Sequence, residues 1–163
     1  MKALILIRHA KSSWETITDD FNRPLNERGK HDAPQMAGRL LNEKIIIDSF
    51  ISSPAKRAKK TARLFMEEFQ VSKEEIILIP ELYNAAASVF FKVVTSLDKS
   101  SNTVAIFAHN PGITDFVNSL TSFKTGEMPT CGVFAIKINS DSWEDFETAN
   151  KDFWFFKYPK LKN

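Results

Sequence analysis

Five short apolar runs, each bounded by polar residues, place the strongest constraint on how this chain of 163 residues can fold. The runs are typical of β-strands and cover residues 3–7, 49–52, 76–79, 103–108 and 133–138. Segments with helical periodicity separate the first four runs, which predicts right-handed βαβ units and a largely parallel sheet. The first run is apolar without interruption, as expected of a strand that is buried on both faces.

The helix expected after the second strand has the clearest pattern. Ser53 is suited to cap it, and Pro54 is suited to be its first residue. One stripe of this helix is apolar and is expected to face the core. A second stripe is cationic and is expected to be solvated; it consists of Lys56, Lys59, Lys60 and Arg63.

Three other helices and one more strand are predicted less sharply. A helix is expected to follow Asn110 and Pro111, which again provide a cap and a first-turn proline. Another spans about residues 86–97, and an earlier one lies within residues 26–42, where a glycine and a proline leave its start open. The aromatic tail at residues 152–160 is expected to form an extra strand that packs in the core.

Composition and charge limit the classes of protein that the chain can represent. With 43% hydrophobic and 26% charged residues, it has the composition of a soluble globular protein of one domain. The net charge of +2 suits a small anionic substrate and is too low for a typical nucleic-acid-binding surface. No apolar run approaches the ~20 residues that span a bilayer, and no signal peptide precedes the first strand. With the single cysteine, Cys131, these features predict a cytoplasmic protein.

Several kinds of chemistry lack the residues that they need. The five glycines form neither a dinucleotide fingerprint nor a phosphate-binding P-loop, and the three histidines form no zinc motif. Cys131 has no arginine shortly after it, so we expect a small, partly buried side chain rather than a phosphatase nucleophile. No G-x-S-x-G motif supports serine acyl transfer. Histidine and arginine chemistry remains.

Two of the three histidines follow predicted strands. His9 comes at the end of the first strand and His109 at the end of the fourth, whereas His31 lies in a helical region and is expected at the surface. Ligands bind at the carboxyl ends of the strands in open α/β sheets. Lys11 stands close to His9, and the helix expected to begin at Asn110 would offer unpaired N–H groups to an anion.

Two arginines are expected to join these histidines. Arg57 lies about 110° from both the apolar and the cationic stripe of its helix, in the first turn and near the strand ends. Arg8 precedes His9 directly, and because adjacent strand residues face opposite ways, the strand must turn there or Arg8 must curl round. Arginine pairs two phosphate oxygens at once, and a neutral imidazole can act as a phosphoryl acceptor. The combination predicts a site for a tetrahedral dianion.

The chain resembles the histidine phosphatase superfamily, and in particular its small phosphohistidine-phosphatase branch. Members of this superfamily have a phosphoglycerate mutase-like fold. Five segments carry the resemblance: LILIRHAKSSW at 4–14, RPLNERG at 23–29, ISSPAKRAKKTA at 51–62, PELYNA at 80–85 and FAHNPG at 107–112. The fold it implies is a three-layer α/β/α sandwich whose central sheet is mostly parallel, with an antiparallel edge strand. It implies no cofactor and no metal.

The resemblance also implies roles for individual residues. His9 is expected to be the nucleophile that becomes phosphorylated, and Glu81 is the candidate proton donor. The residues that it implies hold the phosphoryl group are Arg8, Arg57 and His109. Asn110, at the start of the helix after the fourth strand, is expected to bind phosphate with them.

The expected function is a phosphohydrolase with a covalent phosphohistidine intermediate that acts on phosphohistidine in a protein. Two alternatives stay open: a small-molecule phosphomonoesterase or mutase of the same superfamily, and a non-catalytic phosphate-binding module. The expected partner is a phosphorylated substrate, with no nucleic acid and no membrane. The sequence leaves the oligomeric state open.

Overall fold

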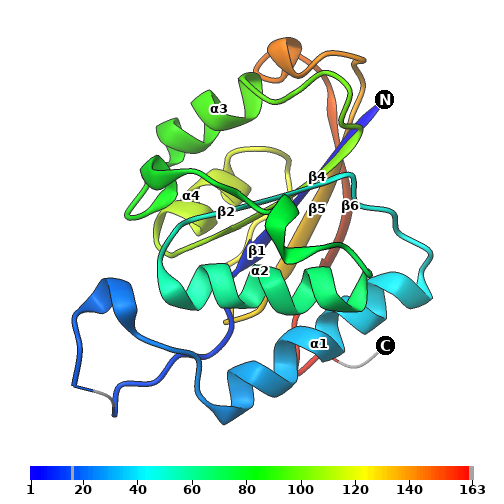
Figure 1. The fold of residues 1–163 in the computed structure, drawn as a ribbon. Coiled ribbons are helices and arrows are strands. Elements are labelled where there is room, and N and C mark those ends of the chain that lie inside the picture. Colours follow the sequence, from blue (N-terminus) through cyan, green and yellow to red (C-terminus); the bar gives the residue numbers. More distant parts are fainter. Residues whose placement is uncertain (16, 162–163) are drawn as a thin grey trace.

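A computed structural model describes residues 1–15 and 17–161 and has three layers, with helices on both faces of one sheet (Figure 1). The sheet has six strands in the order β3-β2-β4-β1-β5-β6. Their bounds are β1 Lys2–Arg8, β2 Ser49–Ser52, β3 Ile77–Leu78, β4 Thr103–Ala108, β5 Val133–Ile138 and β6 Lys151–Lys157. The helices are α1 Glu27–Asn42, α2 Lys56–Glu68, α3 Ala87–Thr95 and α4 Gly112–Asn118, with short 3-10 turns at Asp20–Asn22, Lys73–Glu75, Pro80–Leu82 and Trp143–Asp145. The expected α/β sandwich is confirmed.

Strand β1 divides the core into two halves because its side chains alternate between the two faces. Leu4 and Leu6 join the apolar cluster under α3 and α4, whereas Ile5 and Ile7 join the cluster under α1 and α2. All four side chains are fully buried. The uninterrupted apolar run therefore forms the centre of the sheet, as its pattern predicted.

The antiparallel strand of the sheet is β5, and it lies one position in from the edge. It pairs antiparallel with β1 on one side and with β6 on the other, so β6 runs in the same direction as β1. The aromatic tail forms the predicted extra strand, but as the edge strand it is only partly buried, and Phe153 remains 45% exposed. Edge position explains this, because an edge strand has a neighbour on one side only.

Two helices begin later in the chain than their predicted N-cap residues, Ser53 and Asn110, indicated. Helix α2 starts at Lys56 because Ala55, at its N-cap, has a non-helical backbone. The Ser53 hydroxyl accepts from the N–H of Ala55 at 3.2 Å and so forms a turn ahead of the helix. Helix α4 starts at Gly112, with Pro111 at its N-cap instead of Asn110. By contrast, Asn26 caps α1 by accepting a hydrogen bond from the N–H of Gly29, which fixes the start that the sequence left open.

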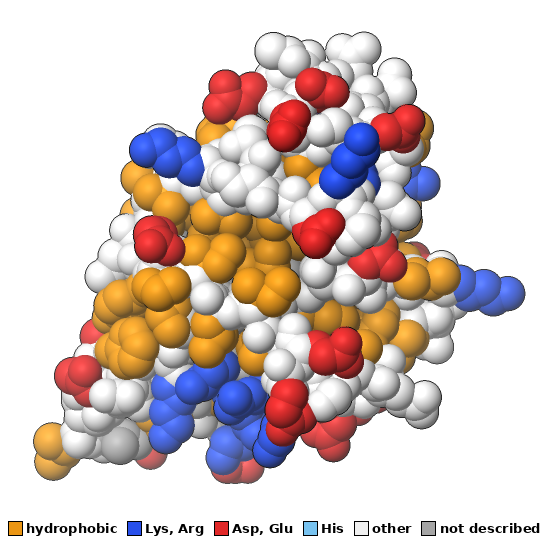
Figure 2. All heavy atoms as spheres, turned by 45° about the horizontal axis from the view of Figure 1, so that its top comes forward, with side chains coloured by type: hydrophobic (Ala, Val, Ile, Leu, Met, Phe, Trp, Pro, Cys, Tyr) orange, Lys and Arg blue, Asp and Glu red, His pale blue; other side chains and the backbone are white. Residues whose placement is uncertain are grey.

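The opposite edge of the sheet is short and apolar. Strand β3 has two residues, Ile77 and Leu78, and both are exposed because only β2 pairs with them. Figure 2 shows apolar side chains gathered on one face of the molecule, with a group of lysine and arginine side chains next to them. Within the described ranges, no helix has the length and hydropathy that crossing a membrane requires.

Candidate active site

The two strand-end histidines meet in one cavity. His9 follows β1 and His109 follows β4, and these strands are parallel neighbours, so their carboxyl ends lie side by side. The two imidazole centroids are 5.2 Å apart. The cavity beside them has a volume of about 170 Å³ and is lined by Arg8, His9, Lys11, Ser12, Trp14, Arg23, Arg57, His109, Asn110 and Thr130.

The surroundings of His9 fix its tautomer. Its Nδ1 lies 2.8 Å from the carbonyl oxygen of Ala10, which can only accept, so Nδ1 carries the proton. Its Nε2 is then the lone-pair nitrogen, and Nε of Arg57 donates to it at 3.3 Å. Burial lowers the pKa of His9 well below its usual value, and the nearby His109 and Arg57 act in the same direction. His9 is therefore a neutral imidazole with its unprotonated Nε2 in the cavity.

His109 is held by a hydroxyl group that the sequence had suggested for another role. Its Nε2 lies 2.8 Å from the Oγ of Ser53, the residue expected to cap α2. Burial and the charge of Arg57 lower the pKa of His109 to about 4, so this imidazole is also neutral near pH 7. Its Nδ1 is buried and has no hydrogen-bond partner in the described part of the chain.

Arg57 is the buried cation of α2, as its place on the helical wheel predicted. It is 5% exposed, whereas Lys56 and Lys60 of the cationic stripe are exposed. Its guanidinium donates to the backbone oxygen of Asp20 at 2.7 Å and to the Asp20 carboxylate at 3.1 Å. These contacts fix the orientation of the guanidinium group, whose Nε donates a hydrogen bond to His9.

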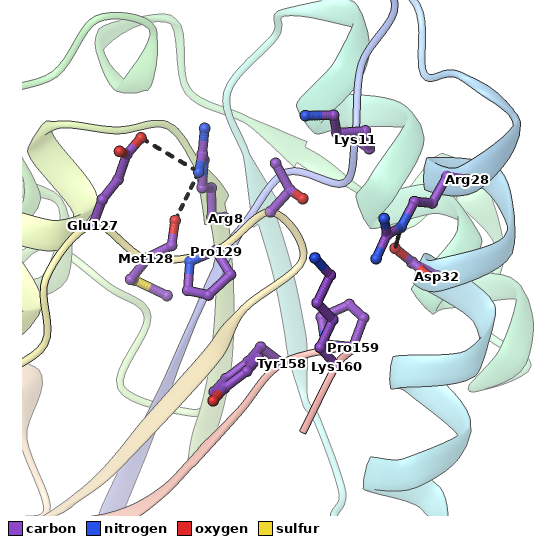
Figure 3. Close-up of a pocket in the computed structure, with 11 residues that line it drawn as sticks. Arg8, Lys11, Arg28, Asp32, Glu127, Met128, Pro129, Tyr158, Pro159 and Lys160 are labelled. Atoms are coloured by element: carbon purple, nitrogen blue, oxygen red, sulfur yellow. Dashed lines mark hydrogen bonds and ion pairs between the residues drawn. The ribbon is translucent and has the colours of Figure 1, made fainter. Parts of the chain in front are cut away.

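Arg8 reaches the cavity because β1 ends there. The N–H of Cys131 donates to the carbonyl oxygens of both Arg8 and His9, and the N–H of Ala10 donates to the Thr61 hydroxyl, so the chain turns at His9. The guanidinium of Arg8 donates to the carbonyl oxygen of Met128 at 2.7 Å (Figure 3). Its Nε is buried without a partner among the described residues.

Arg23 is a third arginine that lines the cavity, and it was not among the site residues predicted from the sequence. It is 7% exposed, donates to the Ser12 hydroxyl at 2.6 Å and stacks on the Trp14 ring, with its guanidinium carbon 3.6 Å from the ring centroid. The segment RPLNERG contained this residue, but no periodicity marks a loop arginine as buried. Only the resemblance could have found it.

Asp20 ties three of these groups together. Its carboxylate accepts from Arg57, from Nε of Arg23 at 3.2 Å and from the hydroxyl of Tyr83 at 2.6 Å. The Tyr83 hydroxyl, followed by Arg57 and Arg23, lowers the pKa of Asp20 to about 2. The ring of Tyr83 in turn packs edge-on against His109, with centroids 5.7 Å apart. No pattern in the sequence pointed to Asp20, and Tyr83 was present only as a member of the PELYNA segment that carries the resemblance.

Asn110 lines the cavity, but it does not cap α4. Its side-chain N–H donates to the carbonyl oxygen of Met128 at 3.0 Å, and its Oδ1 accepts from the Thr114 hydroxyl at 2.6 Å. The amide is thus used to hold the loop before β5 against the site.

Glu81 lies outside the cavity. It is exposed on the 3-10 turn after β3 and lines an apolar groove with Ile77, Val93 and neighbouring side chains of β2, β3 and α3. The structure therefore brings together His9, Arg8, Arg57, His109 and Asn110, and leaves Glu81 apart. The other two single-residue expectations concern His31, whose side chain is 74% exposed as predicted, and Cys131, which is fully buried rather than partly.

The donor set suits an anion better than a metal ion. Within residues 1–15 and 17–161, no group of three or more histidine, cysteine, aspartate or glutamate side chains could hold a metal. Instead the cavity combines three arginine guanidiniums with two neutral imidazoles. Guanidinium groups bind the oxygens of phosphate in a bidentate manner.

Comparison with known families agrees with this site. Residues 4–90 match the model of the histidine phosphatase superfamily, branch 1. The chain belongs to this superfamily, and its membership indicates an enzyme of the phosphohydrolase class.

Sequence relatives include both unassigned proteins and mutases. An uncharacterized chloroplastic protein of Arabidopsis thaliana is 27% identical over 153 residues, which cover 88% of this chain and 70% of that protein. A 2,3-bisphosphoglycerate-dependent phosphoglycerate mutase of Bartonella henselae is 31% identical over 84 residues, covering 50% of this chain and 41% of the mutase.

Solved structures share the whole fold. The putative phosphohistidine phosphatase SixA from Agrobacterium tumefaciens superposes with a TM-score of 0.81 at 23% identity, covering 97% of this chain and 98% of that one. The protein histidine phosphatase SixA in complex with tungstate gives a TM-score of 0.82 at 19% identity, covering 96% of this chain and 97% of the other. At these identities the likeness shows the fold.

Proposed function

We propose that this chain removes phosphoryl groups from phosphohistidine in proteins through a covalent intermediate on His9. The observation that carries the proposal is the orientation of His9, whose unprotonated Nε2 faces a cavity lined by three arginines. Phosphoryl transfer needs little covalent help from the protein beyond positioning and fixed positive charge. This cavity supplies both.

In the first step, Nε2 of His9 attacks phosphorus and the bond from phosphorus to the substrate imidazole nitrogen breaks. The electron pair stays on that nitrogen, which takes up a proton from water. Arg57, Arg8 and Arg23 line the space in which the phosphoryl oxygens would lie. Throughout, the proton on Nδ1 of His9 stays bonded to the carbonyl oxygen of Ala10, so the ring becomes cationic only while it is phosphorylated.

In the second step, water attacks the phosphorus atom of phospho-His9. The bond between phosphorus and Nε2 breaks, its electron pair returns to the imidazole, and inorganic phosphate leaves. We assign His109 the tautomer whose Nε2–H donates to the Ser53 hydroxyl, so that its Nδ1 accepts the proton of the attacking water. Because the pKa of His109 is about 4, the imidazolium then passes this proton to solvent, which restores the free enzyme.

The choice of phosphohistidine rests on the leaving group. An alkoxide needs a proton donor as it departs, whereas an imidazole is a better leaving group and needs less help. The carboxyl groups that contact residues of the cavity offer little such help, since Asp20 has a pKa of about 2 and Glu127 is paired with Arg8 at 3.6 Å. Glu81 lies in another groove. Likeness to the protein histidine phosphatase SixA, whose complex with tungstate involves a tetrahedral oxyanion, supports the same substrate class.

His9→Ala tests the proposal directly. We expect the wild type to hydrolyse inorganic phosphoramidate and a phosphohistidine peptide, and the variant to show no turnover above background. Brief exposure of the wild type to phosphoramidate should also label it with an acid-labile, base-stable phosphoryl group. Hydrolysis retained by His9→Ala would contradict the proposal, and a wild type that binds phosphate but is neither labelled nor active would be a non-catalytic binding module.

A small-molecule phosphomonoesterase or mutase is the second candidate, favoured by the match to the Bartonella henselae mutase. In that case Glu81 would act as the proton donor from a rearranged turn. Glu81→Gln should then slow hydrolysis of alkyl phosphates severely and spare phosphoramidate. Equal rates for wild type and variant on both substrates would remove this candidate.

A further inference from the structure

The cavity beside His9 and His109 is called the phosphoryl cavity below. A larger cleft opens beside it, on the side of α1. It has a volume of about 520 Å³ and shares Arg8, Lys11 and Thr130 with the cavity. The remaining lining residues come from α1, from the loop before β5 and from the chain after β6; they are Arg28, Asp32, Glu127, Met128, Pro129, Tyr158, Pro159 and Lys160. A group bound at His9 would therefore extend directly into this cleft.

The charges of the cleft are unbalanced. Four cations line it, Arg8, Lys11, Arg28 and Lys160, against the two carboxylates of Asp32 and Glu127. Both carboxylates already have partners, since Asp32 lies 3.5 Å from Arg28 and Glu127 lies 3.6 Å from Arg8. Among the described residues, no ion pair engages Lys11 or Lys160. Figure 3 shows Lys11, Arg28 and Lys160 reaching toward the cleft from three separate segments.

The excess positive charge is confined to this side of the site. A second cleft, of about 540 Å³, shares Arg8 and Asn110 with the phosphoryl cavity on the side of α4. There Arg8 is the only cation among the lining residues, and it is opposed by Asp115 and Glu127. A long substrate therefore meets a cationic wall on one side of its phosphoryl group and an acidic wall on the other.

The cationic cleft is built on fixed backbone. The guanidinium of Arg39 on α1 donates to the carbonyl oxygens of Tyr158, Pro159 and Leu161, at 3.0, 3.0 and 2.7 Å, and so holds the segment that carries Lys160. At the other wall, a Cβ on Gly29 would lie 2.2 Å from the carbonyl oxygen of Lys11, so α1 packs directly on that backbone. The backbone that carries these cations is thus held in place before a ligand binds.

We propose that this cleft binds carboxylate side chains next to the phosphohistidine of the protein substrate, and so gives the enzyme a preference for acidic sequence on one side. The inference rests on the function proposed above. A volume of about 520 Å³ falls within the range of ligand sites and can take two or three side chains. Exposed ion pairs act mainly on association and binding, so the effect belongs in KM.

The experiment compares three kinds of phosphoryl donor. The first kind is inorganic phosphoramidate, which has no flanking group. The second and third kinds are phosphohistidine peptides with two glutamates or two glutamines beside the phosphohistidine, and each kind of peptide is made in two versions, with the flank on one side or on the other. For the better-placed glutamate peptide we expect a KM about three- to tenfold below that of its glutamine partner, with unchanged kcat. The difference should shrink as salt is added.

Charge reversal in the cleft should remove this preference. Arg28→Glu and Lys160→Glu are each expected to raise the KM of the glutamate peptide to that of the glutamine peptide or above, with phosphoramidate turnover unchanged. Lys160→Glu disturbs no ion pair among the described residues, so it remains informative if Arg28→Glu fails to fold. Lys60→Glu, an equal change of charge on the exposed stripe of α2, is the matched control and should keep the preference.

Three results would overturn the inference. One is an equal KM for glutamate and glutamine peptides with the wild type, and another is an equal preference in Lys160→Glu and Lys60→Glu. The third is stronger inhibition by a small carboxylate-bearing phosphoester than by the glutamate peptide, which would assign the cleft to a small dianionic substrate. Failure of the proposed function looks different, because then neither phosphoramidate nor any peptide is hydrolysed.

Discussion

The phosphoryl cavity and the cationic cleft use similar side chains in opposite ways. In the cavity, His9, His109 and Arg57 are each at most 6% exposed, and their polar atoms are aimed by hydrogen bonds to fixed groups. In the cleft, the side chain of Arg28 is 55% exposed, and Lys11 and Lys160 are exposed too. A charge in the cavity acts in a poorly solvated space, whereas a charge in the cleft is weakened by water and salt.

With the proposed function, this difference assigns catalysis to the cavity and substrate selection to the cleft. Electrostatic stabilisation of a transition state requires donors that are already in place and screened from solvent, which describes the cavity. Selection among substrates needs only modest, adjustable attraction, which describes the cleft. Substitutions in the first region should therefore change kcat, and those in the second should change KM.

The largest effect is expected from Arg57→Ala. Loss of its guanidinium removes a buried cation from the phosphoryl cavity, and kcat for phosphoramidate should fall about 10²- to 10³-fold. Lys60→Ala, on the exposed stripe of the same helix, should stay within about twofold of the wild type. A similar decrease in both variants, measured by steady-state kinetics, would mean that burial of Arg57 has no catalytic consequence.

The next largest effect concerns stability and pH. The pKa of His109 is about 4 in the folded protein and close to 6.5 in the unfolded chain. Between these pH values the unfolded chain binds a proton that the folded protein does not, so stability decreases as the pH falls from 6.5 to 4. The free energy of unfolding should drop by about 3 kcal/mol over this interval because of His109, and His9 acts in the same direction. Urea denaturation at a series of pH values gives the free energy of unfolding of the wild type and of His109→Gln. Between pH 6.5 and 4 this free energy should decrease less steeply with falling pH in the variant.

A smaller effect is expected at the wall that the cavity and the cleft share. Gly29→Ala would press a methyl group on the backbone of Lys11 and should destabilise the protein by about 1–3 kcal/mol. Gly38 lies in the same helix with nothing within 4 Å of its added Cβ, so Gly38→Ala should stabilise by about 0.5–1 kcal/mol. Thermal unfolding of the two variants measures the contrast. A change of stability in the same direction for both variants would mean that the Lys11 backbone does not restrict the side chain at position 29.

The smallest effect is expected from Asp20→Asn. The substitution removes the negative charge that orients Arg57, Arg23 and Tyr83 but keeps a side chain of the same shape. We expect kcat to fall about tenfold with little change in KM, because Asp20 positions the guanidiniums and does not line the cavity. Tyr83→Phe provides the comparison, since it breaks one of the three contacts. An increase in KM without a change in kcat would contradict this role and would mean that Asp20 affects substrate binding, as the residues of the cleft do.

The periodicity of the sequence predicted much of the fold and three residues of the site, namely His9, His109 and Arg57. The uninterrupted apolar run of β1 predicted a central strand, and the position of Arg57 between two stripes of α2 predicted a buried cation. Errors arose where a polar side chain had two possible partners. Ser53 and Asn110 both suited helix caps, but Ser53 bonds His109 and Asn110 bonds the loop before β5, and both helices start later.

The sequence by itself determined which side chains end the strands, because the lengths of apolar runs and the two-residue period are local properties of the chain. Only the tertiary structure decided that Arg23 lines the cavity, that Asp20 and Tyr83 lie behind its side chains, and that Glu81 faces a different groove. The physical reason is that loop residues carry no period, so their direction depends on which buried charges and hydrogen-bond acceptors are near them after the sheet has formed.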